Sequence, residues 1–174
     1  MDRPVGSEAA ALGAAVLEES RRRLVKGFPA QVRECLDRLD DAKVWWRPHE
    51  SGNAVGNLVL HVCGSSRHFL GYVLDGSHYR RDRKAEFAER GPITRADLCR
   101  LIDDTVDETD RILTGLDPAR LRDVREVPRE APHTVLALVV RTSHHWAVHT
   151  GQIVYATKAL TKGGLDELWM KTML

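Results

Sequence analysis

Cysteine is scarce in this chain, and the three that occur are widely separated. Cys35, Cys63 and Cys99 form no CxxC pair, and their number is odd. A disulfide framework needs paired cysteines, and a thiolate zinc site needs closely spaced ones. Neither kind of site is expected, and a reducing, cytoplasmic location fits this cysteine content.

Long apolar runs are missing as well. No stretch reaches the roughly 18 consecutive apolar residues of a membrane-spanning helix. The apolar N-terminal segment is short, has no basic lead-in and ends at Glu18. Neither a transmembrane helix nor a signal peptide is therefore expected.

The chain also lacks an excess of charge of either sign. Its formal net charge at pH 7 is +1, which creates no overall field that would attract nucleic acid or an anionic membrane. Two basic clusters, at residues 21–23 and 80–84, are interrupted or flanked by acidic residues, which favours a solvated helix face for each. The expected partner is a small-molecule substrate, with no role for nucleic acid or a membrane.

What the chain does contain is the composition of a globular protein, with 43% hydrophobic and 29% charged residues. Its 174 residues suffice for one hydrophobic core and are few for two. Residues 1–174 are therefore expected to form a single domain.

Apolar residues recur at helical spacing in four long segments, of which two lie in the first half. The first is expected over residues 7–39, with a bend near Gly27 and Pro29. The second is expected over residues 53–74, with Asn53 as its N-cap.

The second half holds the other two segments. A helix is expected to open at Thr94, where the letters TRAD form an approximate capping box, and to end before the letters GLDP. The last is expected to begin near Pro132 and to end at about Thr161, before two glycines.

The connections complete the expected architecture. Extended, residues 75–92 span roughly 60 Å, more than the ~30 Å length of a twenty-residue helix, so this link can cross the whole bundle. The polar connection over residues 116–130 is expected to contain short extended pieces. We predict an all-α four-helix bundle.

Three histidines occur within six residues in the letters SHHWAVHTGQI of the last helix. Steps of three and four from Leu138 place His145 and His149 on the face that should point into the bundle. His144 is rotated by about 100° from His145 and is expected at the periphery.

Two imidazoles on an interior face need partners. Each neutral ring carries one donor and one acceptor, and an unmet one in a core costs about 1 to 3 kcal/mol. Rings four residues apart can both bind one divalent cation, which removes that cost. The alternative is two core histidines that are bonded to a carbonyl or a water.

A third ligand would have to come from another helix. His61 is the candidate, and His68 on the same helical stripe is its competitor, since about 10 Å along the helix axis separates them. Asn57 and Gln152 lie one turn from an expected ligand and are candidates for its outer partners, with simple surface or packing roles equally open.

The chain resembles the DinB-like superfamily, including its YfiT-like group of proposed metal-dependent hydrolases. The resemblance rests on the segments WWRP, NAVGNLVLHV, RDRKAEF and HHWAVHTGQIV, and it covers residues 17–161. Its most specific element is one histidine in the second helix combined with HxxxHxGQI in the fourth. Within the superfamily the likeness is to a branch of uncharacterised function.

This resemblance implies an up-down-down-up bundle whose metal ligands are His61, His145 and His149. It also implies a divalent ion, Ni²⁺ or Zn²⁺ above all, and a homodimer. Related members are transferases and isomerases that use mycothiol, bacillithiol or glutathione. No Asp or Glu stands clearly on the stripes near the expected metal, so the carboxylate base that a hydrolase would need is not evident from the sequence.

Three functional hypotheses follow. The first is a metal-dependent enzyme that activates a low-molecular-weight thiol as an S-transferase or isomerase, because three neutral histidines leave positions open at the ion. The second is a non-catalytic metal-binding bundle, for instance in a stress response. The third is a metal-dependent hydrolase. Trp169, Met170 and Met173 are expected to pack on a second subunit.

Overall fold

Four long helical segments form the protein in the computed structural model, which describes residues 5–91 and 93–162. The first combines α1 (Val5–Arg21), a π-helical segment η1 (Arg22–Gly27) and α2 (Phe28–Asp37), and the second combines α4 (Val55–Ser66) with a π-helical segment η2 (Arg67–Leu74). The third and fourth are α6 (Arg95–Thr114) and α7 (Val135–Thr161). The shorter elements are α3 (Asp41–Val44), α5 (Arg83–Ala88), η3 (Pro118–Arg122), β1 (Val124–Arg125) and β2 (His133–Thr134).

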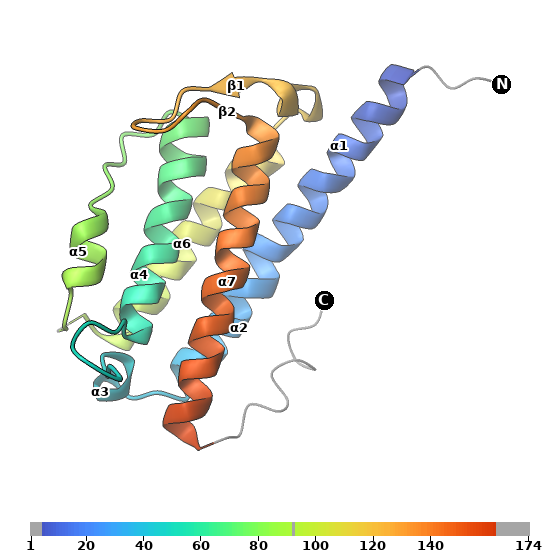
Figure 1. The fold of residues 1–174 in the computed structure, drawn as a ribbon. Coiled ribbons are helices and arrows are strands. Elements are labelled where there is room, and N and C mark those ends of the chain that lie inside the picture. Colours follow the sequence, from blue (N-terminus) through green and yellow to red (C-terminus); the bar gives the residue numbers. More distant parts are fainter. Residues whose placement is uncertain (1–4, 92, 163–174) are drawn as a thin grey trace.

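The directions of these helices confirm the predicted bundle (Figure 1). The first and last long helices run one way, and α4 and α6 both run the opposite way. Two consecutive helices can be parallel only if the chain between them returns along the bundle, and the link that carries α5 does so. α4 packs against α6 and α7, and α2 packs against the same two helices. The fold is all-α, with an up-down-down-up order.

The π-helical segments mark where the long helices change their winding. The first, Arg22–Gly27, stands directly before Phe28 and Pro29, where a bend was predicted. Proline lacks the N–H that continues an α-helical ladder, so a widened turn before it relieves the mismatch.

Two predicted helix starts are wrong by a few residues, and one is confirmed. The N-cap of α4 is Ala54 rather than Asn53, because the Asn57 Oδ1 reaches back and accepts the Ala54 N–H at 3.1 Å. Thr94 caps α6 as predicted, and its Oγ1 accepts the Asp97 N–H at 3.1 Å.

The start of the last helix differs because a small strand pair takes its first residues. Val124 pairs with Thr134 and Arg125 with His133 in an antiparallel register. Pro132 therefore precedes β2 instead of occupying a first helical turn, and the Thr134 Oγ1 caps α7 by accepting the Ala137 N–H at 3.1 Å. β1 is a short extended piece of the kind expected over residues 116–130, whereas β2 lies in the span that was expected to be helical.

The core fills the space between the four long helices. Its fully buried side chains include Leu36, Val59, Ile102, Val139 and Ile153, one or more from each long helix. Each such side chain contributes about 1.5–3 kcal/mol by leaving water. Among the described residues, no helix has both the length and the apolar character that crossing a bilayer requires.

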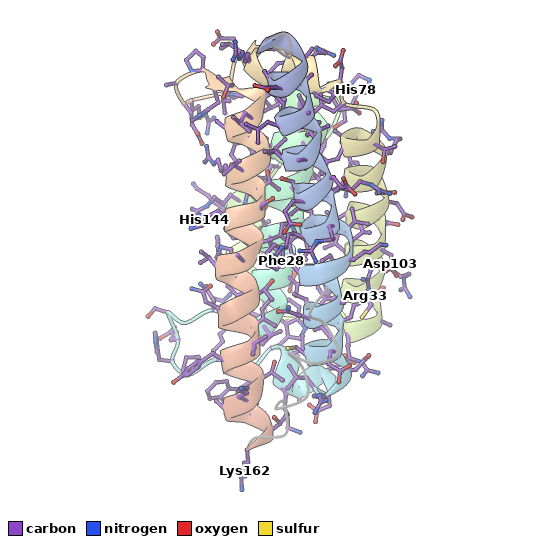
Figure 2. The ribbon with its side chains drawn as sticks, turned by 90° about the vertical axis from the view of Figure 1, so that its right-hand side faces the viewer. Phe28, Arg33, His78, Asp103, His144 and Lys162 are labelled. Atoms are coloured by element: carbon purple, nitrogen blue, oxygen red, sulfur yellow. The ribbon has the colours of Figure 1, made fainter. Side chains whose placement is uncertain are left out.

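Polar contacts tie the helices together around this core. The buried Trp146 ring of α7 donates its Nε1–H to the Ser66 Oγ of α4 at 2.7 Å. On the outside, Arg33 of α2 forms an ion pair with Asp103 of α6 (Figure 2). His144 points outward from α7 in the same view and is exposed, as its position on the helix predicted.

Candidate metal centre

Three histidines from two helices meet in one cluster. The Nε2 of His145 lies 3.1 Å from the Nε2 of His61 and 3.1 Å from the Nε2 of His149. One ring nitrogen of each residue lies within 4.8 Å of the others. His61 is buried, and the other two rings are half-buried. The residues that the sequence nominated as ligands are thus brought together.

The outer nitrogen of His61 is held by a buried pair of opposite charges. Its Nδ1 lies 2.8 Å from the Glu86 Oε2, and Arg81 binds both Glu86 oxygens, with Nε at 2.7 Å and Nη2 at 2.9 Å. Burial raises the pKa of the Glu86 carboxyl, but hydrogen bonds from His61 and Arg81 outweigh it, so its pKa lies below the usual range. Glu86 is therefore an ionised acceptor.

This pair fixes which nitrogen of His61 carries the proton. The Arg81 Nη2 also lies 3.0 Å from the His61 Nδ1 and could donate to it if Nδ1 carried no proton. In that case, however, the lone pair of Nδ1 would face a lone pair of the Glu86 carboxylate and repel it. Nδ1–H therefore donates to Glu86, and Arg81 donates to the carboxylate and to the His61 carbonyl. The His61 Nε2 is left with a lone pair that points into the cluster.

Glu86 reaches His61 because the crossing link folds into a short helix beside α4. The Asp82 carboxylate caps α5 by accepting the Ala85 N–H at 3.0 Å, and the buried Asn57 Nδ2 donates to the Glu86 carbonyl at 2.8 Å. A Cβ on Gly64 would collide with the Glu86 Oε1. Gly64 thus leaves the space that the carboxylate occupies, and Asn57 positions α5 rather than contacting a histidine.

Sequence reasoning missed Glu86 and Arg81. No carboxylate was evident on the helical stripes, and the one that the structure places beside the cluster comes from the link instead. The basic cluster at residues 80–84 is not simply a solvated helix face either, since Arg81 is largely buried against Glu86. The available signal was an Asp82 N-cap followed by helix-forming residues in the letters DRKAEF.

His149 is supported differently. Its Nδ1 lies 2.7 Å from the Oε1 of Gln152, which is one turn further along α7 and exposed. With the amide oxygen in this place Nδ1–H is the donor, so the Nε2 lone pair again points at His145. Burial lowers the pKa of His149, which favours the neutral ring. Gln152 is the outer partner that the sequence suggested.

His145 stands between the two other rings and is neutral. Burial lowers its pKa to about 3, and the neighbouring His149 and His61 add to this effect. A neutral ring has one N–H, so the His145 Nε2 can donate to one neighbour at most. In at least one of its two contacts, the lone pair of the His145 Nε2 therefore faces the lone pair of a neighbouring Nε2 at 3.1 Å.

A cation shared by the three rings would resolve this conflict. Two nitrogens that bind one zinc ion at ~2.0–2.1 Å and at a tetrahedral angle lie about 3.3 Å apart, close to the two separations observed. The outer hydrogen bonds of His61 and His149 are those that hold histidine ligands in place. The three residues fit a divalent ion in both spacing and protonation.

The other histidines lie outside the cluster. His68, the competing ligand, is half-buried and stacks on Tyr72 with ring centroids 5.7 Å apart. His49 and His78 are exposed, and the half-buried His133 contacts Glu130 at 3.3 Å. Of the two candidates on the second helix, only His61 joins the pair on α7.

The cysteines take no part in the cluster. All three are free, and Cys35 and Cys63 are buried. Burial raises the pKa of the Cys63 thiol to about 12, so it is not a thiolate at neutral pH. Trp169, Met170 and Met173, which were expected at a subunit contact, lie outside the described residues.

Comparison with known proteins agrees with this fold. The pattern of a family described as "Protein of unknown function (DUF1572)" matches residues 12–171. A search of curated proteins finds no match.

The solved structures that this chain is similar to include two with a TM-score of 0.61 and 17% identity each. One is a DinB-like protein, YjoA, from Bacillus subtilis, and the likeness covers 80% of this chain and 90% of that one. The other is a conserved protein from Enterococcus faecalis, with 86% and 95% covered. At this identity the likeness shows the fold alone, and it confirms the DinB-like bundle.

Proposed function

The chain belongs to the DUF1572 family of proteins of unknown function, and we propose that it is a metal-dependent enzyme in which His61, His145 and His149 bind a divalent ion. Ni²⁺ and Zn²⁺ are the ions we expect. The reaction we propose is the activation of a low-molecular-weight thiol, of the S-transferase or isomerase type, on a small-molecule substrate. Residues 1–174 act as one domain, in the cytoplasm and as a homodimer.

One observation carries this proposal: three histidine lone pairs converge while the outer nitrogens of His61 and His149 are already engaged. The described residues bring no fourth His, Cys, Asp or Glu into this group. Structural zinc sites usually close with four protein ligands, whereas catalytic ones keep three and leave a position open. The ligand set therefore favours reactivity over a purely structural role.

A divalent ion bound here would supply Lewis acidity, which favours the deprotonated form of a thiol or water at neutral pH. The protein itself would position the ligand rings and provide space for the reactants. Glu86 and Gln152 hold the His61 and His149 rings, and the protein leaves a pocket of about 590 Å³ beside His61 and His145 for the reactants.

Glu86 does not favour a hydrolase reading, although it is a carboxylate near the cluster. Both of its oxygens accept hydrogen bonds, one from Arg81 alone and the other from His61 and Arg81. A general base must lie within hydrogen-bond reach of the proton that it removes and must be basic enough to take it, and the ion pair with Arg81 makes this carboxylate less basic. Glu86 is instead a positioning residue that acts through His61.

Elemental analysis of the purified protein tests the metal. We expect about one divalent ion per chain and almost none in the His145→Ala variant, because that ring contacts both of the others. His144→Ala, which changes the exposed neighbour of His145, is the matched control and should keep the ion. Equal metal content in all three proteins would remove the proposed site.

Turnover tests the thiol chemistry. The metal-loaded protein would be incubated with bacillithiol, mycothiol or glutathione and a model electrophile, beside the His149→Ala variant. Thiol consumption above that variant supports the transferase. A bound ion that raises the melting temperature without any turnover would instead identify a non-catalytic metal-binding bundle. Light scattering near the monomer mass of 19.6 kDa would contradict the homodimer.

A further inference from the structure

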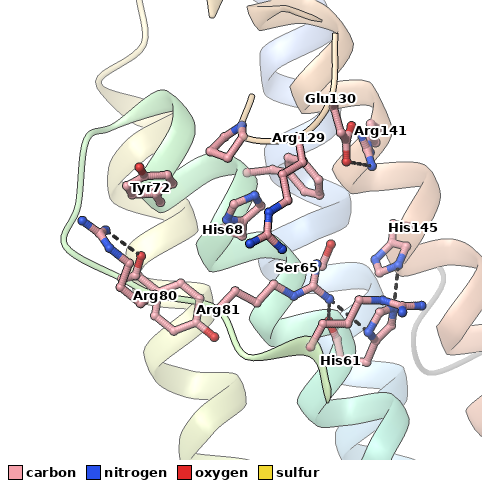
Figure 3. Close-up of a pocket in the computed structure, with 14 residues that line it drawn as sticks. His61, Ser65, His68, Tyr72, Arg80, Arg81, Arg129, Glu130, Arg141 and His145 are labelled. Atoms are coloured by element: carbon pink, nitrogen blue, oxygen red, sulfur yellow. Dashed lines mark hydrogen bonds and ion pairs between the residues drawn. The ribbon is translucent and has the colours of Figure 1, made fainter. Parts of the chain in front are cut away.

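The pocket beside the histidine cluster is rich in arginine (Figure 3). It lies between α4, η2, the crossing link, the turn between β1 and β2, and α7, and its volume is about 590 Å³. Five arginines line it, against the single acidic residue Glu130; they are Arg80, Arg81, Arg83, Arg129 and Arg141. The chain as a whole carries a net charge of only +1, so this concentration of positive charge is local.

Only two of these arginines are neutralised by carboxylates. Arg81 is paired with Glu86, and Arg141 with Glu130. Within residues 5–91 and 93–162, the remaining three have no acidic partner. Arg80 lies over the Tyr72 ring and Arg83 over the Phe87 ring. The walls of the pocket thus present uncompensated positive charge.

Of these three arginines, Arg129 gives the strongest indication of a ligand. It makes no hydrogen bond or ion pair to the described residues, and its guanidinium is directed into the pocket beside His68. Its backbone has φ 66°, a left-handed conformation that is uncommon for a residue other than glycine. This conformation belongs to the turn between β1 and β2, which carries the Arg129 side chain to the pocket.

Two polar side chains deeper in the pocket also lack partners. Ser65 is only 5% exposed, lines the pocket, and makes no side-chain hydrogen bond within the described residues. His68 lines the same wall, and its ring is stacked on Tyr72 but bonded to no described group. Because both residues line the pocket, their polar groups are available to hydrogen-bond a ligand there.

We propose that this pocket binds the oxyanion of an organic acid, a carboxylate or a phosphate monoester. Arg129 and Arg80 supply the charge, Ser65 and His68 supply hydrogen bonds, and the Phe69 and Tyr72 rings contact the apolar body of the ligand. The identification of this ligand as the substrate or thiol cosubstrate rests on the proposed function, because it would place the reacting end beside His145. The anion binding itself does not need the metal.

Ligand-observed NMR with three probes that share a phenyl ring tests this. The probes are benzoate, phenyl phosphate and the neutral benzyl alcohol, each added to chelator-treated and to metal-loaded protein. We expect an anion to bind both forms and benzyl alcohol to bind neither. The tighter of the two anions identifies the oxyanion. Equal binding of benzyl alcohol, or no binding of either anion, would overturn the proposal.

Matched variants locate the binding. Arg129→Gln should weaken the anion at least about tenfold, as expected for a lost charge-assisted hydrogen bond. Arg122→Gln makes the same charge change on an exposed residue outside the pocket and should stay within about twofold of the parent protein. Equal weakening in both variants would show a nonspecific charge effect and contradict the proposal.

The same measurement separates this proposal from the metal. The chelator-treated parent protein, whose pocket lining is unchanged, should still bind the anion. If the anion bound only metal-loaded protein, and bound Arg129→Gln as tightly as the parent protein, it would be a ligand of the metal. That result would contradict the pocket proposal and leave the proposed metal site intact. If elemental analysis found no divalent ion in the purified protein but the anion still bound, the pocket proposal would stand and the proposed metal site would be removed.

Discussion

The two helices that supply the histidine cluster support their rings in opposite ways. On α4, His61 is buried and its outer nitrogen donates to an ionised carboxylate that Arg81 holds from a separate segment. On α7, His149 is half-buried and its outer nitrogen donates to the neutral, exposed amide of Gln152 in the same helix. One side depends on tertiary structure and the other on helical spacing.

This difference predicts how each side responds to change. A buried charged partner cannot be replaced by water without leaving another charge unpaired, so its loss is costly. An exposed amide competes with water throughout, and a water molecule can take its place. The partner of His61 on α4, Glu86, should therefore affect metal affinity more strongly than Gln152, the partner of His149 on α7.

The largest effect is expected for Glu86→Gln. The amide keeps the shape of the side chain but removes the charge that orients His61 and neutralises Arg81. We expect metal binding to weaken by about 10- to 100-fold and the protein to lose on the order of 3 kcal/mol of stability. Competition with a chromophoric zinc chelator and thermal unfolding measure these two effects.

Glu34→Gln is the control for that substitution. Glu34 is paired with Arg38 at 2.6 Å one turn away on α2, and the pair is partly exposed. Its loss should cost below about 1 kcal/mol and leave metal affinity unchanged. If Glu86→Gln bound zinc as tightly as Glu34→Gln does, the hydrogen bond from His61 to Glu86 would not control metal affinity, which would contradict this prediction.

Gly64→Ala is expected to act on the same side without replacing a polar side chain. Its methyl group would displace the Glu86 carboxylate, so we expect about tenfold weaker metal binding. In a Glu86→Gln background the same change should have a smaller effect, because the two substitutions act through one contact. Chelator competition on the four proteins of this cycle gives the coupling.

Gly151→Ala is the matched change on α7. No atom lies within 4 Å of where its Cβ would be, so the substitution should stabilise the helix by about 1 kcal/mol and leave metal binding as it was. An equal loss of affinity in both alanine variants would mean that the space at Gly64 is not what matters.

The sequence was sufficient for the part of the site that helical spacing determines. His145, His149 and Gln152 lie on one helix, so a period of 3.6 residues places them relative to one another. The fold followed from four such periodic segments and from the length of the crossing link. His61 and His68 share a stripe, however, and only the level at which α4 crosses α7 distinguishes them.

Glu86 and Arg81 could not be predicted by the same means. They lie in the crossing link, 25 and 20 residues from His61 in sequence, and they approach it only because the chain turns back along α4. No periodicity relates positions in a link to positions on a helix. The helix starts predicted at Asn53 and Pro132 were wrong for a related reason. The Asn57 side chain sets the first of these starts, and the pairing of β1 with β2 sets the second.

Gln152→Ala tests the weaker support directly. The His149 Nδ1–H would then donate to water, so metal affinity should fall by only about two- to fivefold. Stability should change little because Gln152 is exposed. Chelator competition beside Glu86→Gln measures the contrast. A loss as large as that of Glu86→Gln would mean that burial is not what makes an outer partner effective.

Gln152→Glu is expected to have the smallest effect and the opposite sign. It gives His149 a carboxylate acceptor of the kind that His61 already has, and a charged acceptor makes the ring a stronger ligand. Because the position is exposed, solvent and salt screen the charge, so we expect metal affinity to rise by about two- to threefold, and less at high ionic strength. If instead the affinity rose as far as Glu86→Gln lowers it, the charge of the partner alone would explain the difference between the two helices. An unchanged affinity at low salt would show that the carboxylate acts on His61 only because Arg81 and the surrounding burial hold it there.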